Sequence, residues 1–473
     1  MLSLRDIIFT LTDCEISSLD VQFSHAVIDS RQAVKDSLFI ALPGDRVDGH
    51  DYVRAAFDNG AIAALIHQPL TEKFNTLDLR SGHFDKEKID IELPICLRVE
   101  DTLTALQTIA IQWRQKNPVK TIGITGSVGK TSTKELTASL LASRFKVLKN
   151  PGNRNNEIGL PLTLLELEPH HECAVLEMGF YVPGEIRTLC EIANPQIGVL
   201  TNIGTVHAER AGSQEQIARG KAELVESLPS APQGVAVLNM DDPWVRWMSN
   251  RTNAKIFSYG IEQPADLVAS NIKSLGLEGI TCQIKFQGEK HHIHSPLLGE
   301  FSAYTILCAT AVALTLGLSW DEIIHTLAST RLDLRMRHFS LKNGAIVLDD
   351  SYNASPVSTR AALKLLGGLS GRRVAILGDM LELGPYEKSG HESVGEIAIN
   401  TTDVLILIGE RSKNIADAAI RTGFPSEAIH WFPNTNQATQ EIVDMIQGND
   451  VVLVKGSNVM RMDRVLKALE EGV

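Results

Sequence analysis

The chain has 473 residues, of which 44% are hydrophobic and 22% charged, and its formal net charge is −12. These proportions are typical of a water-soluble globular protein, and the length suggests about three domains. The acidic balance argues against non-specific nucleic-acid binding, which needs a basic surface, so we expect no nucleic-acid partner. Six cysteines without a Cys-x-x-Cys spacing predict free thiols in a reducing, cytosolic compartment.

The first block, residues 1–98, mixes short apolar runs with polar loops. The predicted strands are His25–Ile28, Ser37–Leu42 and Ala61–Ile66, with a helix near Asp51–Asn59 and a solvated loop at Asp85–Asp90. This pattern predicts a small α/β domain.

The second block, residues 99–330, contains a glycine turn between a predicted strand, Thr121–Thr125, and a predicted helix, Thr131–Leu141. Glycines let backbone N–H groups crowd around a phosphate, and the helix N-terminus adds partial positive charge. Lys130 can reach the terminal phosphates of a nucleotide, and the Thr131 hydroxyl can ligate Mg²⁺. The phosphate-loop residues are Gly126, Ser127, Gly129, Lys130, Thr131 and Ser132. The spacing is shorter than the strict Walker motif, and the alternative is a flexible glycine turn with a surface lysine.

Polar residues follow the other apolar strands predicted in this block. The other elements predicted in this block are a helix at Thr102–Gln115, strands at Ala174–Met178, Ile197–Thr201 and Val235–Asn239, a β excursion at 265–297, and a buried helix in the uncharged run Phe301–Trp320. Alternating strands and helices predict a mostly parallel sheet, with ligand groups at the carboxyl ends of its strands. Glu177 and His207 fall at such ends, so Glu177 is a candidate oxygen ligand for Mg²⁺ and His207 a candidate ligand for a metal or phosphate. The alternatives are a surface glutamate and a structural histidine.

Two further polar runs have more than one interpretation. The loop 150–156 contains Asn153, Asn155 and Asn156, which are either a turn cluster or donors to a sugar or carboxylate. Asp349 and Asp350 end the first strand of the third block; they either bind ribose hydroxyls or cap the helix before Pro356.

The third block, residues 331–473, alternates strands and helices throughout. Its predicted strands are Ala345–Asp349, Val374–Leu377, Val404–Ile408, Ile429–Trp431 and Val451–Val454. This alternation predicts a small doubly wound α/β domain.

These motifs, taken in order, resemble the Mur ligase family, the ATP-dependent amide-forming enzymes of peptidoglycan precursor assembly. The matching stretches are Asp29-Ser-Arg31, Leu38–Gly44, Asp48-Gly-His50, Thr125–Ser132, Gly152–Gly159, Leu176–Gly179, Asn239–Pro243, Asp350–Pro356, Leu377–Gly384 and Lys455-Gly-Ser457. The stretch Gly299–Thr305 departs from the family's usual pattern, because Phe301, Ser302 and Thr305 replace a histidine and two asparagines. The resemblance implies three α/β domains: a UDP-binding N-terminal domain, a central P-loop domain with a parallel sheet, and a Rossmann-like C-terminal domain that closes over ATP.

The resemblance also implies roles for matched residues. Lys130 would hold the β- and γ-phosphates, Thr131 and Glu177 one Mg²⁺, and His207 a second. Lys221, which periodicity alone predicts as a solvated helix lysine, would be carbamylated and would support a metal. The remaining implied contacts are Arg335, Asp350, Tyr352 and Asn353 for ATP, and Ser30, Arg31, Asn153, Asn155 and Asn156 for the substrate.

The implied reaction joins D-alanyl-D-alanine to a UDP-N-acetylmuramoyl-tripeptide through an acyl phosphate. We expect a cytosolic monomer with no transmembrane segment. The alternatives are another Mur-like amide ligase, a small-molecule kinase, and a nucleotide-binding protein of this fold without ligase activity.

Overall fold

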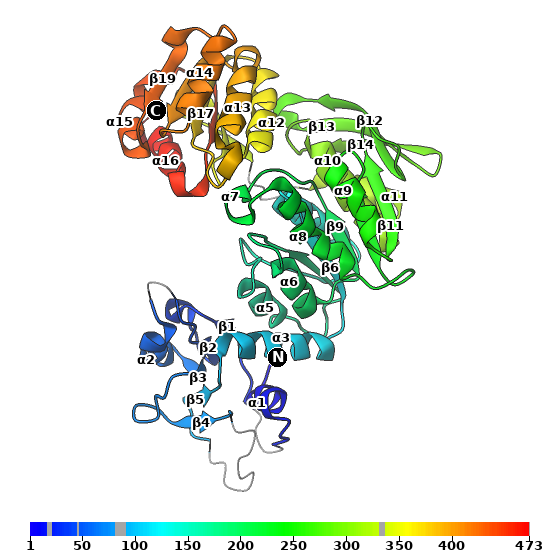
Figure 1. Ribbon diagram of the computed structural model, residues 1–473, viewed down its shortest axis with the longest axis vertical. Coiled ribbons are helices and arrows are strands. Elements are labelled where there is room, and N and C mark those ends of the chain that lie inside the picture. The colour runs from blue at the N-terminus through cyan, green and yellow to red at the C-terminus, as the bar shows by residue number, and fades with distance from the viewer. Residues whose placement is uncertain (17–20, 45–46, 81–90, 331–335, 473) are drawn as a thin grey trace. The chain divides into compact units, whose positions relative to one another are not determined.

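The computed structural model describes residues 1–16, 21–44, 47–80, 91–330 and 336–472. The loop expected at Asp85–Asp90 and the candidate Arg335 lie outside these ranges. The chain divides into two compact units, the first made of residues 1–123, 145–179 and 185–196, and the second of 124–144, 180–184 and 197–473. Three β-sheets follow one another along the sequence, as the colours of Figure 1 show. The protein is therefore a three-domain α/β protein, and the expected boundaries at 98/99 and 330/331 stay predictions.

Twenty strands and sixteen α-helices are present in the described residues. The strands are β1 Ala26–Val27, β2 Ser37–Ile40, β3 Ala61–Ile66, β4 Thr76–Asp78, β5 Ile95–Arg98, β6 Lys120–Thr125, β7 Val147–Lys149, β8 Cys173–Glu177, β9 Ile197–Leu200, β10 Val235–Asn239, β11 Lys255–Gly260, β12 Leu267–Ser274, β13 Ile280–Phe286, β14 Glu289–Ser295, β15 Arg337–Ser340, β16 Ile346–Asp350, β17 Arg372–Gly378, β18 Val404–Ile408, β19 Ile429–Phe432 and β20 Asp450–Lys455. The α-helices are α1 Leu4–Thr12, α2 Val53–Asp58, α3 Thr102–Lys116, α4 Lys130–Ala142, α5 Gly159–Leu164, α6 Glu185–Ala193, α7 Ala208–Ala211, α8 Gln214–Glu226, α9 Pro243–Trp247, α10 Ser302–Thr315, α11 Trp320–Ser329, α12 Pro356–Gly367, α13 Glu387–Thr401, α14 Lys413–Arg421, α15 Thr435–Met445 and α16 Asp463–Gly472.

The first sheet contains five strands in the order β1-β2-β3-β5-β4, and every neighbouring pair is parallel. The expected strands of this block are confirmed, with β1 and β2 both shorter than predicted. The sequence reading missed β4 and β5. Each has only three or four residues, too few to show a period.

The second sheet has nine strands in the order β14-β13-β12-β11-β10-β9-β6-β8-β7. Strands β9 to β12 pair in parallel, whereas β12, β13 and β14 form the antiparallel excursion expected at 265–297. The uncharged segment near 301–320 forms α10, most of which is buried and which packs against α4. Among the described residues, no helix is long and apolar enough to cross a membrane.

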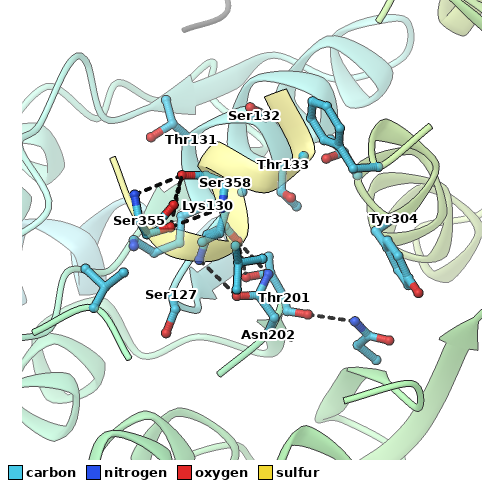
Figure 2. A pocket seen from close by; sticks show the side chains of 18 of the residues that line it. Ser127, Lys130, Thr131, Ser132, Thr133, Thr201, Asn202, Tyr304, Ser355 and Ser358 are labelled. Carbon is cyan, nitrogen blue, oxygen red and sulfur yellow. Dashed lines mark hydrogen bonds between the residues drawn. The ribbon is translucent and has the colours of Figure 1, made fainter. Parts of the chain in front are cut away.

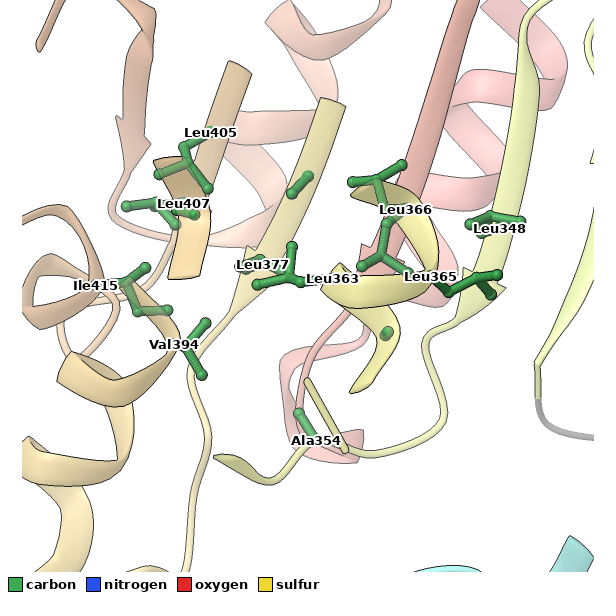
Figure 3. Packing of buried hydrophobic residues seen from close by; sticks show 14 of the residues in the cluster. Leu348, Ala354, Leu363, Leu365, Leu366, Leu377, Val394, Leu405, Leu407 and Ile415 are labelled. Carbon is green, nitrogen blue, oxygen red and sulfur yellow. The ribbon is translucent and has the colours of Figure 1, made fainter. Parts of the chain in front are cut away.

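The third sheet has the order β15-β16-β20-β17-β18-β19, with only β15 antiparallel to its neighbour. Its strands are apolar at consecutive positions because both faces are covered by helices. Leu405 and Leu407 pack on one side with α12, α13 and α14, as Figure 3 shows, whereas Ile406 and Ile408 pack on the other side with α15 and α16. The alternation follows from the two-residue period of a strand. The predicted doubly wound sheet is therefore confirmed, and β15 is an addition to it.

Candidate active site

The glycine turn joins β6 to α4, as the sequence predicted. Gly126 and Gly129 have φ angles of +148° and +84°, which side chains disfavour. A Cβ on Gly126 would lie 1.8 Å from Thr201 Oγ1, so only glycine fits there. Gly129 precedes the first residue of α4, Lys130, and no side chain caps this helix end. The helix N-terminus is therefore left for an anion.

The residues after β9 hold the turn in shape. Asn202 makes two hydrogen bonds with Val128: its Oδ1 accepts from the backbone N–H and its Nδ2 donates to the carbonyl, both at 3.0 Å. Thr201 Oγ1 donates to the same carbonyl at 2.7 Å, and Gly204 N donates to Ser127 Oγ at 2.8 Å. The sequence analysis assigned no role to Thr201 or Asn202. The only signal was a polar pair at a strand end.

Two lysines converge on one carbonyl oxygen. Lys130 Nζ and Lys221 Nζ donate to Gly126 O at 2.8 and 3.1 Å. Lys221 is only 1% exposed on α8, with its Nζ 4.6 Å from the centre of the Phe180 ring. Periodicity alone predicted a solvated lysine here, and that prediction is wrong. The hydrogen bond to Gly126 O places Lys221 at the phosphate loop, and its implied role in supporting a metal stays a prediction.

His207 follows β9 and lies beside these lysines. Burial, together with the positive charges of Lys130, Lys221 and Arg210, lowers the pKa of the His207 imidazole to about 3. Its Nδ1 lies 2.5 Å from Glu382 Oε2, in the loop after β17. The ring also packs edge-on against Tyr181, with ring centroids 4.8 Å apart. The imidazole is therefore neutral at pH 7, the form in which a histidine can accept a bond or bind a metal.

Glu177 belongs to the first compact unit, at the end of β8, and is 1% exposed. Asn155 Nδ2 donates to its Oε1 at 2.9 Å, and the Asn150 side chain bonds its backbone N–H and carbonyl. Asn156 Oδ1 accepts from Gly159 N at the start of α5. The asparagine loop thus holds the Glu177 carboxylate. Whether Asn153, Asn155 and Asn156 also contact substrate stays a prediction.

A cavity of about 450 Å³ lies within the second unit and has the size of a small-ligand site. Figure 2 shows its phosphate-loop side chains together with Thr201, Asn202, Tyr304, Ser355 and Ser358. The predicted site residues that line it are Ser127, Gly129, Lys130, Thr131, Ser132, Asp350 and Asn353. Residues of the second and third sheets therefore share one cavity.

The wall from the third sheet carries a buried ion pair that the sequence reading missed. Lys455, 2% exposed at the end of β20, donates to Asp350 Oδ2 at 2.5 Å and to the Asn353 carbonyl at 2.9 Å. The signal was a polar residue after an apolar strand. The alternative that the aspartate pair caps α12 is wrong, because Ser355 is the N-cap. Tyr352 is 39% exposed and is not among the lining residues.

Phe301, Tyr304 and Thr305 also line the cavity, so the segment that departs from the family pattern faces it. Tyr304 Oη donates to Asp241 Oδ2 at 2.9 Å. Burial and this carboxylate raise the pKa of the Tyr304 hydroxyl above its usual value. The phenol therefore stays protonated and fixed.

Ser30 and Arg31 lie in the first unit, before β2. Ser30 is buried and its carbonyl accepts from Asn59 Nδ2, whereas the Arg31 guanidinium is exposed and pairs with Asp29 at 2.7 Å. Their predicted role in substrate binding stays a prediction.

Among the described residues, no group of three or more His, Cys, Asp or Glu side chains could hold a metal ion by itself. This does not conflict with Mg²⁺ binding, because Mg²⁺ is usually held by one or two carboxylates together with substrate phosphates. The candidate ligands Thr131, Glu177 and His207 supply one hydroxyl, one carboxylate and one imidazole.

Known protein families match nearly the whole chain. The Mur ligase middle domain matches residues 124–313, the glutamate ligase domain of Mur ligases matches 334–458, and the Mur ligase catalytic domain matches 22–114. The UDP-N-acetylmuramoyl-tripeptide–D-alanyl-D-alanine ligase of Synechocystis sp. is 34% identical over 99% of this chain and 97% of its own. The enzyme of that name from Bacillus subtilis is 32% identical over 94% and 92%.

Solved structures agree over a similar length. A crystal structure of MurF from Acinetobacter baumannii has a TM-score of 0.84 and 28% identity, covering 99% of this chain and 98% of its own. MurF ligase from Thermotoga maritima, solved with ADP, has a TM-score of 0.79 and 28% identity, covering 96% and 98%. The full-length match to curated relatives above 30% identity, together with the phosphate loop and cavity, shows that this chain belongs to the Mur ligase family.

Proposed function

We propose that this protein is the ATP-dependent ligase that joins D-alanyl-D-alanine to UDP-N-acetylmuramoyl-tripeptide in peptidoglycan synthesis. The observation that carries the proposal is the full-length similarity to enzymes of that name, in a chain whose glycine turn leads directly into the N-terminus of α4. The cavity beside that loop is large enough for a nucleotide and is lined from two domains.

The chemistry explains why a phosphate loop serves amide formation. A carboxylate resists attack by an amine because it is negatively charged and has a poor leaving group. Transfer of the γ-phosphoryl group of ATP to the terminal carboxylate of the tripeptide removes both obstacles. The amine of the dipeptide then attacks the acyl carbon, the C–O bond to phosphate breaks, and inorganic phosphate leaves as the amine loses a proton.

Lys130 is placed to stabilise that transfer. Its ammonium group lies at the phosphate loop beside the N-terminus of α4, where negative charge develops on the transferred group. The buried pair of Lys455 and Asp350 fixes the opposite wall. A fixed charge needs no rearrangement during the reaction, which is why such groups lower the barrier more than solvent does.

The donor set fits Mg²⁺. Thr131 and Glu177 would hold one ion, and His207 with Lys221 would support a second, as the family resemblance implies. Mg²⁺ would neutralise charge on the phosphate oxygens. Glu177 is suited to this role because its carboxylate is buried and oriented by Asn155, and a buried carboxylate gains from a nearby cation.

A carbamate on Lys221 is supported by the crowding of positive charge. The ammonium groups of Lys221 and Lys130 share the Gly126 carbonyl, and like charges at this distance repel each other. Carbamylation by CO₂ converts Lys221 into an anion with two oxygens. That change turns repulsion into attraction and supplies oxygen ligands for a metal.

The first sheet is proposed to bind the UDP portion of the substrate through Ser30 and Arg31, and the third domain to bring in the dipeptide. We further propose that the enzyme acts as a monomer in the cytosol. The six cysteines all lie in the described residues and none forms a disulfide, which is compatible with a reducing compartment.

The test is phosphate release from ATP and Mg²⁺ with the UDP-muramoyl tripeptide, with and without D-alanyl-D-alanine, followed by mass analysis. Dipeptide-dependent release and a pentapeptide product are expected. Phosphate release that does not depend on the dipeptide would indicate a kinase or another acceptor. Nucleotide binding without release would indicate a non-catalytic member of the family.

A further inference from the structure

Glu382 and His207 come from different domains and meet at one hydrogen bond. His207 lies between β9 and α7, whereas Glu382 lies after β17, before the short 3₁₀ helix η5 (Gly384–Tyr386). The His207 Nδ1 to Glu382 Oε2 distance is 2.5 Å, and the two side chains are 18% and 35% exposed. Glu382 was not among the residues that the sequence analysis singled out. It is 175 positions from His207 along the chain.

The backbone on both sides of this bond adopts unusual conformations. His207 has a φ of +68° and Glu382 a φ of +62°, a region that residues other than glycine rarely occupy. Backbone strain of this kind gathers where a specific geometry is needed. Two such residues facing each other therefore point to a function for their contact.

The two loops also approach each other closely through their backbones. Glu209 N donates to Glu382 O at 3.3 Å. Gly384 has a φ of +53°, and a Cβ there would lie 2.9 Å from Glu209 Cα, so a side chain would prevent the approach. The loop after β17 and the turn that carries His207 are thus packed closely together through their backbones.

The chemistry of the pair fixes which ring nitrogen carries the hydrogen. A carboxylate oxygen can only accept, so Nδ1 must be the donor. Nε2 of the neutral ring is then the acceptor that remains for a phosphate-bound cation or a proton. A carboxylate behind a histidine is the usual arrangement that sets the tautomer and direction of a metal-binding imidazole.

We propose that Glu382 is a positioning residue that holds His207 in the Nδ1–H tautomer, so that the third domain completes the site built on the second sheet. This inference rests on the proposed function for what His207 does, but the tautomer itself depends on neither nucleotide nor metal. The His207 site is then complete only while the loop after β17 is docked. The site is then able to act only when the third domain is docked.

The test uses the full chain labelled with ¹⁵N-histidine, without nucleotide or metal. Long-range ¹H–¹⁵N spectra distinguish the two tautomers, and the His207→Gln variant assigns the signal. The wild type should show Nδ1–H. Glu382→Leu removes the acceptor at similar size and should shift His207 toward Nε2–H, whereas Glu382→Gln keeps an acceptor oxygen and should retain Nδ1–H.

Kinetics give a second readout. Glu382→Leu should lower kcat by about 10- to 100-fold, the usual effect of losing a group behind a ligand, with little change in the KM of the dipeptide. Glu382→Gln should restore much of that loss. Glu387→Leu is the matched control, because its carboxylate pairs with Arg411 at 2.5 Å within the third domain. It should alter neither the tautomer nor kcat.

Several results would overturn the proposal. They are an Nε2–H tautomer in the wild type, an unchanged tautomer in Glu382→Leu, or a kcat that stays within a factor of about two of the wild type. Should the leucine variant fail to fold, Glu382→Ala makes the same test. A wild type that shows Nδ1–H yet releases no phosphate in response to the dipeptide would refute the proposed function and leave the positioning role standing.

Discussion

Asn202 offers a direct test of how the phosphate loop is held. Replacing it with alanine removes both hydrogen bonds to Val128, each 3.0 Å long, without removing any group that the proposed mechanism uses. A neutral hydrogen bond contributes roughly 1 kcal/mol, so about 2 kcal/mol of loop order would be lost. Because about 1.4 kcal/mol corresponds to a factor of ten, ADP should bind roughly 30-fold more weakly.

The assay is calorimetric titration of ADP into the wild type, Asn202→Ala and Asn202→Asp. The aspartate keeps the acceptor for Val128 N but replaces the donor with a charge that repels the Val128 carbonyl, so it should bind no better than alanine. Thermal unfolding of each variant checks that the fold survives. ADP affinity within about twofold of wild type, in a folded Asn202→Ala variant, would refute the idea that this side chain orders the loop.

Three further predictions concern single lysines and one buried histidine. Lys130→Ala should lower turnover by about 10³-fold or more with the fold retained, measured by phosphate release; substantial remaining activity would remove its role at the phosphates. Lys221→Ala should lose about 10- to 100-fold and recover in part with added short carboxylates, and full activity without them would contradict carbamylation. His391 accepts a hydrogen bond from Met380 N through Nε2, and burial lowers its pKa below the ordinary 6.5. The free energy of unfolding that this group contributes should be present above pH 6.5 and lost as pH falls through the lower folded pKa. The free energy of unfolding measured with urea should therefore change less between pH 8 and 5 in His391→Gln than in wild type.

The strands of the third sheet could be predicted because their apolar runs record burial on both faces. Val404–Ile408 was predicted with its observed limits. Strand β15 could not be found this way, because Arg337–Ser340 is a largely exposed edge strand whose pairing with β16 depends on tertiary contact.

The residues of the site also differ in whether a local sequence pattern could predict them. Lys130 and Glu177 carry local signals, a glycine turn and a polar strand end, and the sequence reading found both. Asn202, Lys455 and Glu382 act through partners 74 to 175 positions away. No local pattern records such pairings, because they arise only when separate strands bring their ends together.

Helix α10 has a consequence for the thermal inactivation of the protein. Eleven of its fourteen residues are buried, and the run from Phe301 to Trp320 carries no charge. Once the second sheet opens, this segment is exposed with no like charges to keep neighbouring chains apart, and exposed apolar segments associate faster than they refold. We therefore expect thermal inactivation to be irreversible and faster at higher protein concentration, so the half-life of activity at a given temperature is a kinetic quantity that the folding equilibrium does not determine.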